Sequence, residues 1–208
     1  GDSIEVQGTP TARTISAAST GAILLRASTD YNNNSPIQDG YNGGSGEAGS
    51  AGRIVMQNGS LIQSQDGNIT LRGDGDLLLS VIDANSNNDA TVGNVTISAD
   101  DAGQSTAMAD AAGAIIDNQG AETANIRANL ATLTAATGIG STDDIETDVT
   151  TIAADNDGTT GDIQIYEVAP GAPVNPISVN QLSQSNAGGS GNLSLTTEDG
   201  DINVISGQ

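Results

Sequence analysis

A five-residue phrase recurs along the chain and constrains its fold more than any other feature. The phrase is a glycine, a small polar residue that is usually Asn or Asp, an aliphatic residue, a free position and a second aliphatic residue. It occurs twice in succession between Gly67 and Leu79. Because strand side chains alternate between two faces, the aliphatic residues of each copy point the same way. Each copy therefore predicts a short strand with one buried face.

Copies of the phrase are distributed over the whole sequence at irregular spacing. They occur at 21–25, 52–56, 67–71, 75–79, 93–97, 161–165, 191–195 and 200–204. Weaker strands are expected at 60–64, 114–116, 145–149 and 177–179. Recurrence of one supersecondary unit at variable spacing is typical of a solenoid with variable loops. The expected fold is all-β, a parallel β-helix in which inward Ile, Leu and Val side chains form ladders.

The doubled phrase at 67–79 has a local alternative. Only Arg72, Gly73 and Asp74 separate its two copies, so a hairpin is possible there. Two strands that meet at a glycine corner of one coil explain the same stretch and also the second doubling at 191–204. The recurrence favours the coil.

One β-helical module spanning residues 1–208 is expected, with two unusual stretches. Residues at about 30–51 are rich in Gly and Asn and predict a long loop between coils. The stretch at about 103–140 is rich in alanine, and Ile126, Leu130 and Leu133 fall at helical spacing. Strands are favoured over a helix, because the phrase resumes on both sides without capping signals.

The composition narrows the possible partners. The 208 residues contain 26 acidic side chains against five arginines, without lysine or histidine, for a net charge of -21. Nucleic acid is therefore excluded as an expected partner, because phosphate binding needs clustered Lys and Arg, whereas cations are attracted. The absence of cysteine excludes disulfides, and no apolar run is long enough to predict membrane insertion. Three tyrosines are the only aromatic residues, which predicts a narrow aliphatic interior.

Calcium is the expected cofactor, because three segments place oxygen ligands at short intervals. Hard cations take six to eight oxygens, often from one curled segment. Asp and Asn also form turns and cap corners without any ion, and that alternative stays open. The candidate ligands are Asp83, Asn85, Asn87 and Asp89 in the first segment, Asp155, Asp157 and Asp162 in the second, and Asp30, Asn32 and Asn34 in the third.

Acceptor motifs for N-glycosylation form another group of candidate sites. Three of them coincide with the phrase, so that the Asn and the hydroxyl residue both face outward. Coincidence is the alternative, because the phrase itself favours Asn and Thr at these positions. The motifs begin at Asn33, Asn58, Asn68, Asn94 and Asn192.

The segments 126–140, 144–149 and 160–165 resemble the repeat regions of very large secreted bacterial surface proteins of the filamentous-haemagglutinin type. The resemblance extends over most of residues 52–208. It implies a right-handed parallel β-helix that serves as a shaft at the cell surface or outside the cell. It carries over no catalytic residues.

The expected function is therefore structural and non-enzymatic, the shaft of an adhesin or the subunit of a cell-surface filament. Strand phrases extend from Gly1 to Val204, so both ends are expected to lack caps and to stack on other copies or on the rest of a longer chain. Cell-surface glycans are a further expected partner. The alternative is a carbohydrate-binding or carbohydrate-degrading β-helix that works through carboxylates, an Arg and one of the tyrosines.

Overall fold

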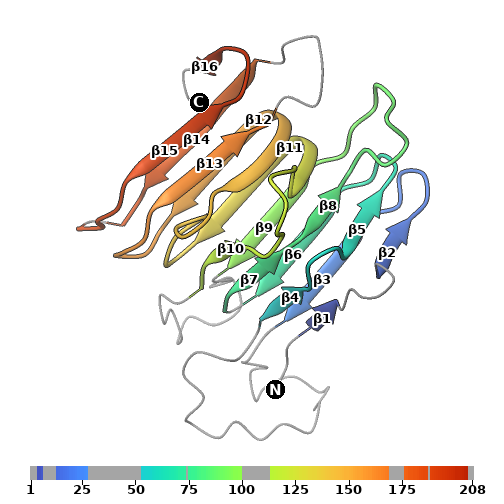
Figure 1. Ribbon diagram of the computed structural model, residues 1–208, viewed down its shortest axis with the longest axis horizontal. Coiled ribbons are helices and arrows are strands. Elements are labelled where there is room, and N and C mark those ends of the chain that lie inside the picture. Colours follow the sequence, from blue (N-terminus) through green and yellow to red (C-terminus); the bar gives the residue numbers. More distant parts are fainter. Residues whose placement is uncertain are drawn as a thin grey trace, which may run out of the picture.

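The computed structural model describes residues 4–6, 13–27, 53–73, 75–99, 113–168, 176–186 and 188–205. Over these ranges the chain forms β-strands and no helix (Figure 1). None of the described segments is a helix long and apolar enough to cross a membrane. The prediction of an all-β chain is confirmed.

The strands are short, except for two near the middle of the chain. They are β1 (Ile4–Val6), β2 (Thr14–Ala17), β3 (Ile23–Ala27), β4 (Ile54–Met56), β5 (Leu61–Ser64), β6 (Ile69–Gly73), β7 (Leu77–Leu79), β8 (Val81–Asp83), β9 (Val95–Ala99), β10 (Ile115–Asp117), β11 (Ile126–Ala135), β12 (Ile145–Asn156), β13 (Ile163–Glu167), β14 (Ile177–Gln184), β15 (Leu193–Thr197) and β16 (Ile202–Val204).

Every copy of the phrase coincides with a strand, namely β3, β4, β6, β7, β9, β13, β15 or β16. The weaker predicted strands correspond to β5, β10, β12 and β14. In the alanine-rich stretch, β11 covers the residues for which a helix was the alternative, so the strand interpretation is confirmed there. The predicted loop at 30–51 and residues 103–112 lie outside the described residues.

The strands pair in parallel and form three ladders. The first contains β1, β4, β7 and β10 and continues through single bridges at Ile139 to β13 and then β15. The second runs β2, β5, β8, β11, β12 and β13, and the third runs β3, β6, β9, β11, β12, β14 and β16. The long strands β11 and β12 thus serve two ladders each. The strands β6 and β7 belong to different ladders, so the hairpin interpretation of the doubled phrase is wrong.

Register places aliphatic residues over aliphatic residues from one strand to the next. In the first ladder the aligned side chains of Ile54, Leu77, Ile115, Ile139 and Ile163 are all fully buried. The third ladder has an equivalent column of Ile69, Val95, Ala131 and Ile152. These columns form the core. Its side chains are narrow, as the scarcity of aromatic residues predicts.

The glycine of the phrase lies where the chain turns into the next ladder. A Cβ on Gly67 would lie 2.1 Å from the carbonyl oxygen of Gly21, and one on Gly93 would lie 2.3 Å from that of Gly67. The Ser64 hydroxyl donates to the Gly21 oxygen and accepts from the Gly67 amide, both at 2.9 Å. A side chain has no room at these corners, so the requirement for glycine is steric.

The Asn or Asp of the phrase also has a structural reason. The Asn68 side-chain oxygen accepts a hydrogen bond from the Asn94 amide at 2.9 Å, and the Asn129 side chain donates to that of Asn94 at 3.3 Å. At another corner, Asp162 accepts from the Asn192 amide at 2.7 Å. The bonds to the Asn94 and Asn192 amides satisfy backbone donors, and all three bonds connect segments that are distant in the sequence.

The steric role of the corner glycines predicts that Gly93→Ala destabilises the protein by roughly 1–3 kcal/mol, because the new Cβ displaces the Gly67 backbone. The matched control is Gly120→Ala, since the only close contact of a Cβ there is the Asn58 side chain at 3.1 Å. Urea denaturation measures both changes. Equal stability of the two variants would contradict the steric role.

Candidate functional site

The first predicted calcium segment, after β8, is held by its own hydrogen bonds. Asp83 accepts from the Asn85 amide at 2.8 Å, and Asn85 accepts from the Asp89 amide at 3.1 Å. The Asn87 side chain donates to Asp89 at 2.9 Å. This is the pattern that the turn alternative requires. Calcium binding by these four residues stays a prediction.

Arg127 connects this segment to the strands beside it. Register aligns Asp83, Arg127 and Asp148 on β8, β11 and β12, and Arg127 reaches the two carboxylates at 3.5 and 3.0 Å. It also donates to the Asn88 side chain at 3.2 Å. One of the few positive charges of the chain thus lies between two negative ones across three parallel strands.

The second predicted calcium segment follows β12. The Asp155 carboxylate accepts from the hydroxyl groups of Ser183 and Ser185 at 2.7 and 2.8 Å. Burial raises the pKa of Asp157, and the neighbouring charge of Asp155 adds to this effect. The Asp162 carboxylate accepts the hydrogen bond from the Asn192 amide at the corner described above. Ion binding here stays a prediction, and the third segment at 30–34 lies outside the described residues.

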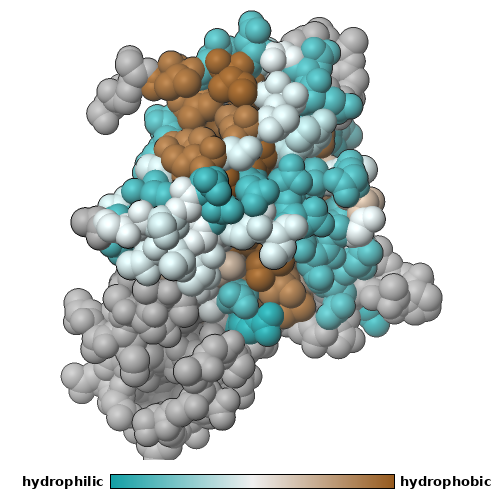
Figure 2. Space-filling view, turned by 60° about the vertical axis from the view of Figure 1, so that its left-hand side comes forward, coloured by the Kyte–Doolittle hydropathy of each residue, from teal (hydrophilic) through white to brown (hydrophobic). Residues whose placement is uncertain are grey.

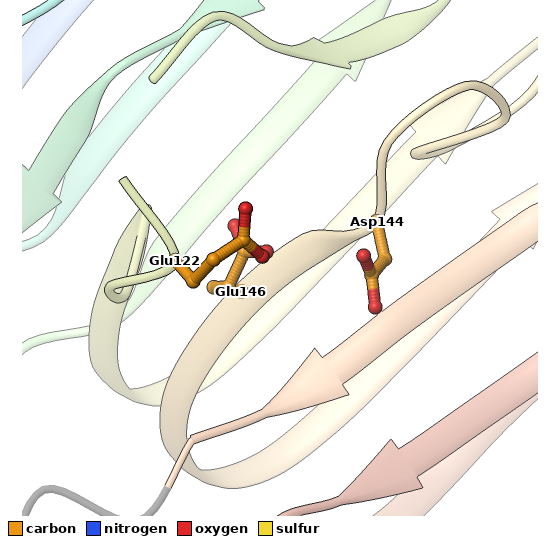
Figure 3. Close-up of side chains that lie close together, drawn as sticks. All are labelled: Glu122, Asp144 and Glu146. Carbon is orange, nitrogen blue, oxygen red and sulfur yellow. The ribbon is translucent and has the colours of Figure 1, made fainter. Parts of the chain in front are cut away.

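A different group of acidic side chains comes together at the start of β12. Glu122, Asp144 and Glu146 each contribute a carboxylate oxygen, and these oxygens lie within 4.8 Å of one another. Glu122 belongs to the segment between β10 and β11, Asp144 directly precedes β12, and Glu146 is in β12 (Figure 3). Among the described residues, this is the group of three or more acidic side chains that could hold a metal ion.

Glu146 is only 1% exposed. Its neighbours Ile145 and Thr147 face inward. Because side chains alternate along a strand, the Glu146 side chain lies on the opposite face. The segment that carries Glu122 covers it. This segment is fixed to β12 because Asn125 exchanges two hydrogen bonds with the Glu146 backbone, at 2.8 and 2.9 Å.

Burial raises the pKa of Glu146 to about 8, and the negative charges of Asp117, Asp144 and Glu122 contribute to the increase. The Oε2 atom of Glu146 is buried without a hydrogen-bond partner. Burial also raises the pKa of Asp117, although this carboxylate accepts hydrogen bonds from the Gln119 amide and the Asn125 side chain. The site is therefore rich in negative charge, and it runs from the exposed Glu122 through the half-buried Asp144 to the buried Glu146.

None of these three residues was predicted from the sequence as a ligand. In the sequence, Glu146 alternates with apolar residues and reads as a solvent-facing position of a strand. The available signal was the close spacing of Asp143, Asp144 and Glu146 directly before and within a predicted strand. Glu122 joins the group through contact between segments that are distant in the sequence. Such contact leaves no local sequence pattern.

A second buried carboxyl group, Glu167, lies inside the core itself. It continues the column of Ile82, Ile126 and Thr147 in the second ladder and is 3% exposed. Its carboxylate oxygens lie 2.5 Å from the Thr147 hydroxyl and 2.9 Å from the Val149 amide, which donates to it. Burial raises its pKa to about 7 despite these bonds.

The glycosylation motifs lie on the surface where they are described. Asn58, Asn68 and Asn192 are exposed and Asn94 is half-buried, whereas Asn33 lies outside the described residues. Their position is compatible with modification, which stays a prediction.

No family model, no curated protein and no solved structure matches the chain. The resemblance to adhesins of the filamentous-haemagglutinin type therefore stays a prediction.

The buried carboxyl of Glu167 predicts an unusual dependence of stability on pH. Its pKa is about 7 in the folded protein and near 4.5 in the unfolded chain, so the unfolded chain loses this proton first as the pH rises. The Glu167 contribution to the free energy of unfolding should fall between about pH 4.5 and 7, by on the order of 3 kcal/mol, and Glu146 should extend the fall to about pH 8. Urea denaturation in metal-free buffer at several pH values measures this.

Glu167→Gln is the matched variant, because it removes the ionisation and keeps the shape. It should equal the parent protein at pH 4 and exceed it in stability at pH 8. Glu146 contributes a slope of the same sign, which both proteins share. Parallel stability curves for the two proteins would show that Glu167 does not titrate as described.

Proposed function

We propose that the chain is a right-handed parallel β-helix that serves as a non-enzymatic, extracellular structural module. The order of the strands supports the coil. Successive strands enter the first, second and third ladders and then return to the first, as β1 to β4 and β4 to β7 do. Such a return is the defining property of a chain that coils with three strands in each turn.

Handedness follows from a general rule. Connections between parallel strands of one sheet are right-handed in nearly all proteins, because a right-twisted strand packs back on its sheet only in that sense. Every described pairing between these strands is parallel, so each connection between successive members of a ladder falls under the rule. This supports the right-handed form.

The observation that carries the functional proposal is at the end of the molecule that bears β15 and β16. Ile177 is fully buried, whereas its register partner Ile202 in the next strand is 44% exposed. Val179 is 7% exposed and its partner Val204 is 79% exposed. Core columns thus continue to this end and stop there with their last side chains in solvent.

The backbone at this end is open as well. Within the described residues, β15 pairs only with β13, and β16 pairs only with β14. Apolar side chains gather on the part of the surface that Figure 2 turns forward, where this end lies. A free strand edge next to an apolar surface is a template for another strand. Another turn of β-helix in the same register would bury both.

The proposed role is therefore the shaft of an adhesin or the subunit of a cell-surface filament, extended by end-to-end stacking. The occupant of the open end is a turn from a second copy or from the rest of a longer chain. The extracellular location rests on the resemblance described above. Stacking of separate copies, unlike continuation in a longer chain, requires association between purified copies, which is measurable.

Purified protein should form linear assemblies whose length increases with concentration. Val204→Asp should shift the protein to monomer, because a carboxylate would then have to be buried at the junction. Leu24→Asp is the matched control. Leu24 is 66% exposed but points away from the column formed by its neighbour Ile23. Sedimentation velocity and negative-stain microscopy report the assemblies.

Two results would contradict end-to-end stacking of separate copies. One is a parent protein that remains monomeric at every concentration. The other is an equal loss of association in both variants, which would indicate general aggregation through exposed apolar residues instead of stacking at one end.

A further inference from the structure

We propose that Glu122, Asp144 and Glu146 bind a calcium ion that fastens the segment between β10 and β11 to β12. This site differs from the segments that the sequence predicted as calcium loops. It is also independent of end-to-end stacking, because all three residues lie within one copy.

The spacing of the three carboxylates suits calcium. Calcium binds oxygen at about 2.3–2.6 Å, so ligands on opposite sides of the ion are up to roughly 5 Å apart. The three oxygens lie within 4.8 Å of one another. They come from two successive turns of the chain, and in Figure 3 Asp144 lies at the start of β12 and Glu122 on the covering segment.

The second and independent observation is the Oε2 atom of Glu146. It is buried and has no hydrogen-bond partner, in a residue that is 1% exposed. Buried polar atoms in folded proteins nearly always have partners, and a buried negative charge requires a proton or a cation. The Glu146 carboxylate that bears this oxygen is one of the three in the cluster, so an ion bound there would give the group its missing partner.

Neutral oxygen is present in the same covering segment. The Gln119 side chain is 8% exposed, and its amide nitrogen donates to the carbonyl oxygens of Ala121 and Thr123 at 3.1 and 3.0 Å. Its Oε1 atom, in contrast, is buried without a partner. Calcium accepts amide oxygens and water together with carboxylates. The covering segment and β12 thus each hold a buried oxygen atom without a partner, on Gln119 and Glu146.

The charged groups that act on Glu146 are all negative. Asp117 adds a fourth negative charge near Glu146. Among the described ion pairs, Arg53 contacts Asp76, and Arg127 contacts Asp83 and Asp148. The sequence has only five arginines and neither lysine nor histidine, so a bound cation would add positive charge where side chains supply little.

Calorimetric titration of the full chain, after treatment with a chelator, tests the site. The parent protein should bind one calcium ion and bind magnesium more weakly. Glu146→Gln should abolish binding and Glu122→Gln should weaken it roughly tenfold or more. Asp89→Asn and Asp155→Asn are the matched controls, since each removes a carboxylate from a predicted calcium segment, and both should bind as the parent does.

Thermal unfolding separates loss of the site from loss of the fold. Without calcium, Glu146→Gln should be at least as stable as the parent, because it removes a buried charge. Calcium should raise the melting temperature of the parent by several degrees and leave that of Glu146→Gln unchanged.

Terbium luminescence locates the ion. Tyr166 is the register partner of Glu146 on the adjacent strand, so the two side chains share a face. Terbium, which replaces calcium in oxygen sites, should luminesce on excitation of tyrosine. Tyr166→Leu should abolish the luminescence and retain calcium binding, whereas Glu146→Gln should abolish both.

Three outcomes would overturn the assignment. The first is absence of saturable calcium binding by the parent protein. The second is binding that survives Glu122→Gln and Glu146→Gln but is lost in Asp89→Asn or Asp155→Asn, which would place the ion in a predicted segment. The third is binding of magnesium as tight as that of calcium. None of these results depends on whether copies stack, so the site and the proposed function fail separately.

Discussion

Close contact between backbones at the corners is the constraint on which the rest of the structure depends. Paired strands lie about 4.8 Å apart, and at the corners one segment lies directly over the carbonyl of another. Gly67 lies over the Gly21 carbonyl, Gly93 over Gly67, and Gly191 over Gly161, without space for a Cβ. Because each corner is fixed on the one before it, the strand that follows starts in register. The aliphatic columns are a consequence of this register.

The burial of a residue in one of these columns depends on whether a neighbouring strand covers that position, whatever the residue type. Glu167 lies in line with Ile126 and Thr147 and is buried as they are, which is why its pKa is raised to about 7. Val204 occupies the same column as Val179 and is exposed because no further strand covers it within the described residues. Position in the ladder, more than residue type, decides burial. The unusual carboxyl group and the apolar end thus have one cause.

The sequence predicted the features that a short local pattern determines. It did not predict features that depend on contact between segments distant in the sequence. The phrase predicted its strands because alternation and the corner glycine lie within five residues. Glu146 was missed, because its burial depends on the segment that carries Glu122, more than twenty positions earlier and without a phrase. The parallel order of the ladders could be inferred from recurrence alone. The sequence alone could not rank the acidic segments as ion sites, because the partners of their side chains come from distant parts of the chain. Arg127, for example, contacts carboxylates on two other strands.

Register also determines how the net charge of -21 is distributed. It places Arg127 between Asp83 and Asp148, so three aligned strands carry alternating charge. The fold also brings Glu122 close to Glu146, and the charged groups that act on Glu146 are all negative. In a filament of such copies, negative charge would accumulate along the axis and oppose the apolar contact at each junction. Bound cations reduce that repulsion. The proposed calcium site lies within one copy and the proposed stacking lies between copies, so cations in general would ease stacking whether or not that site is occupied.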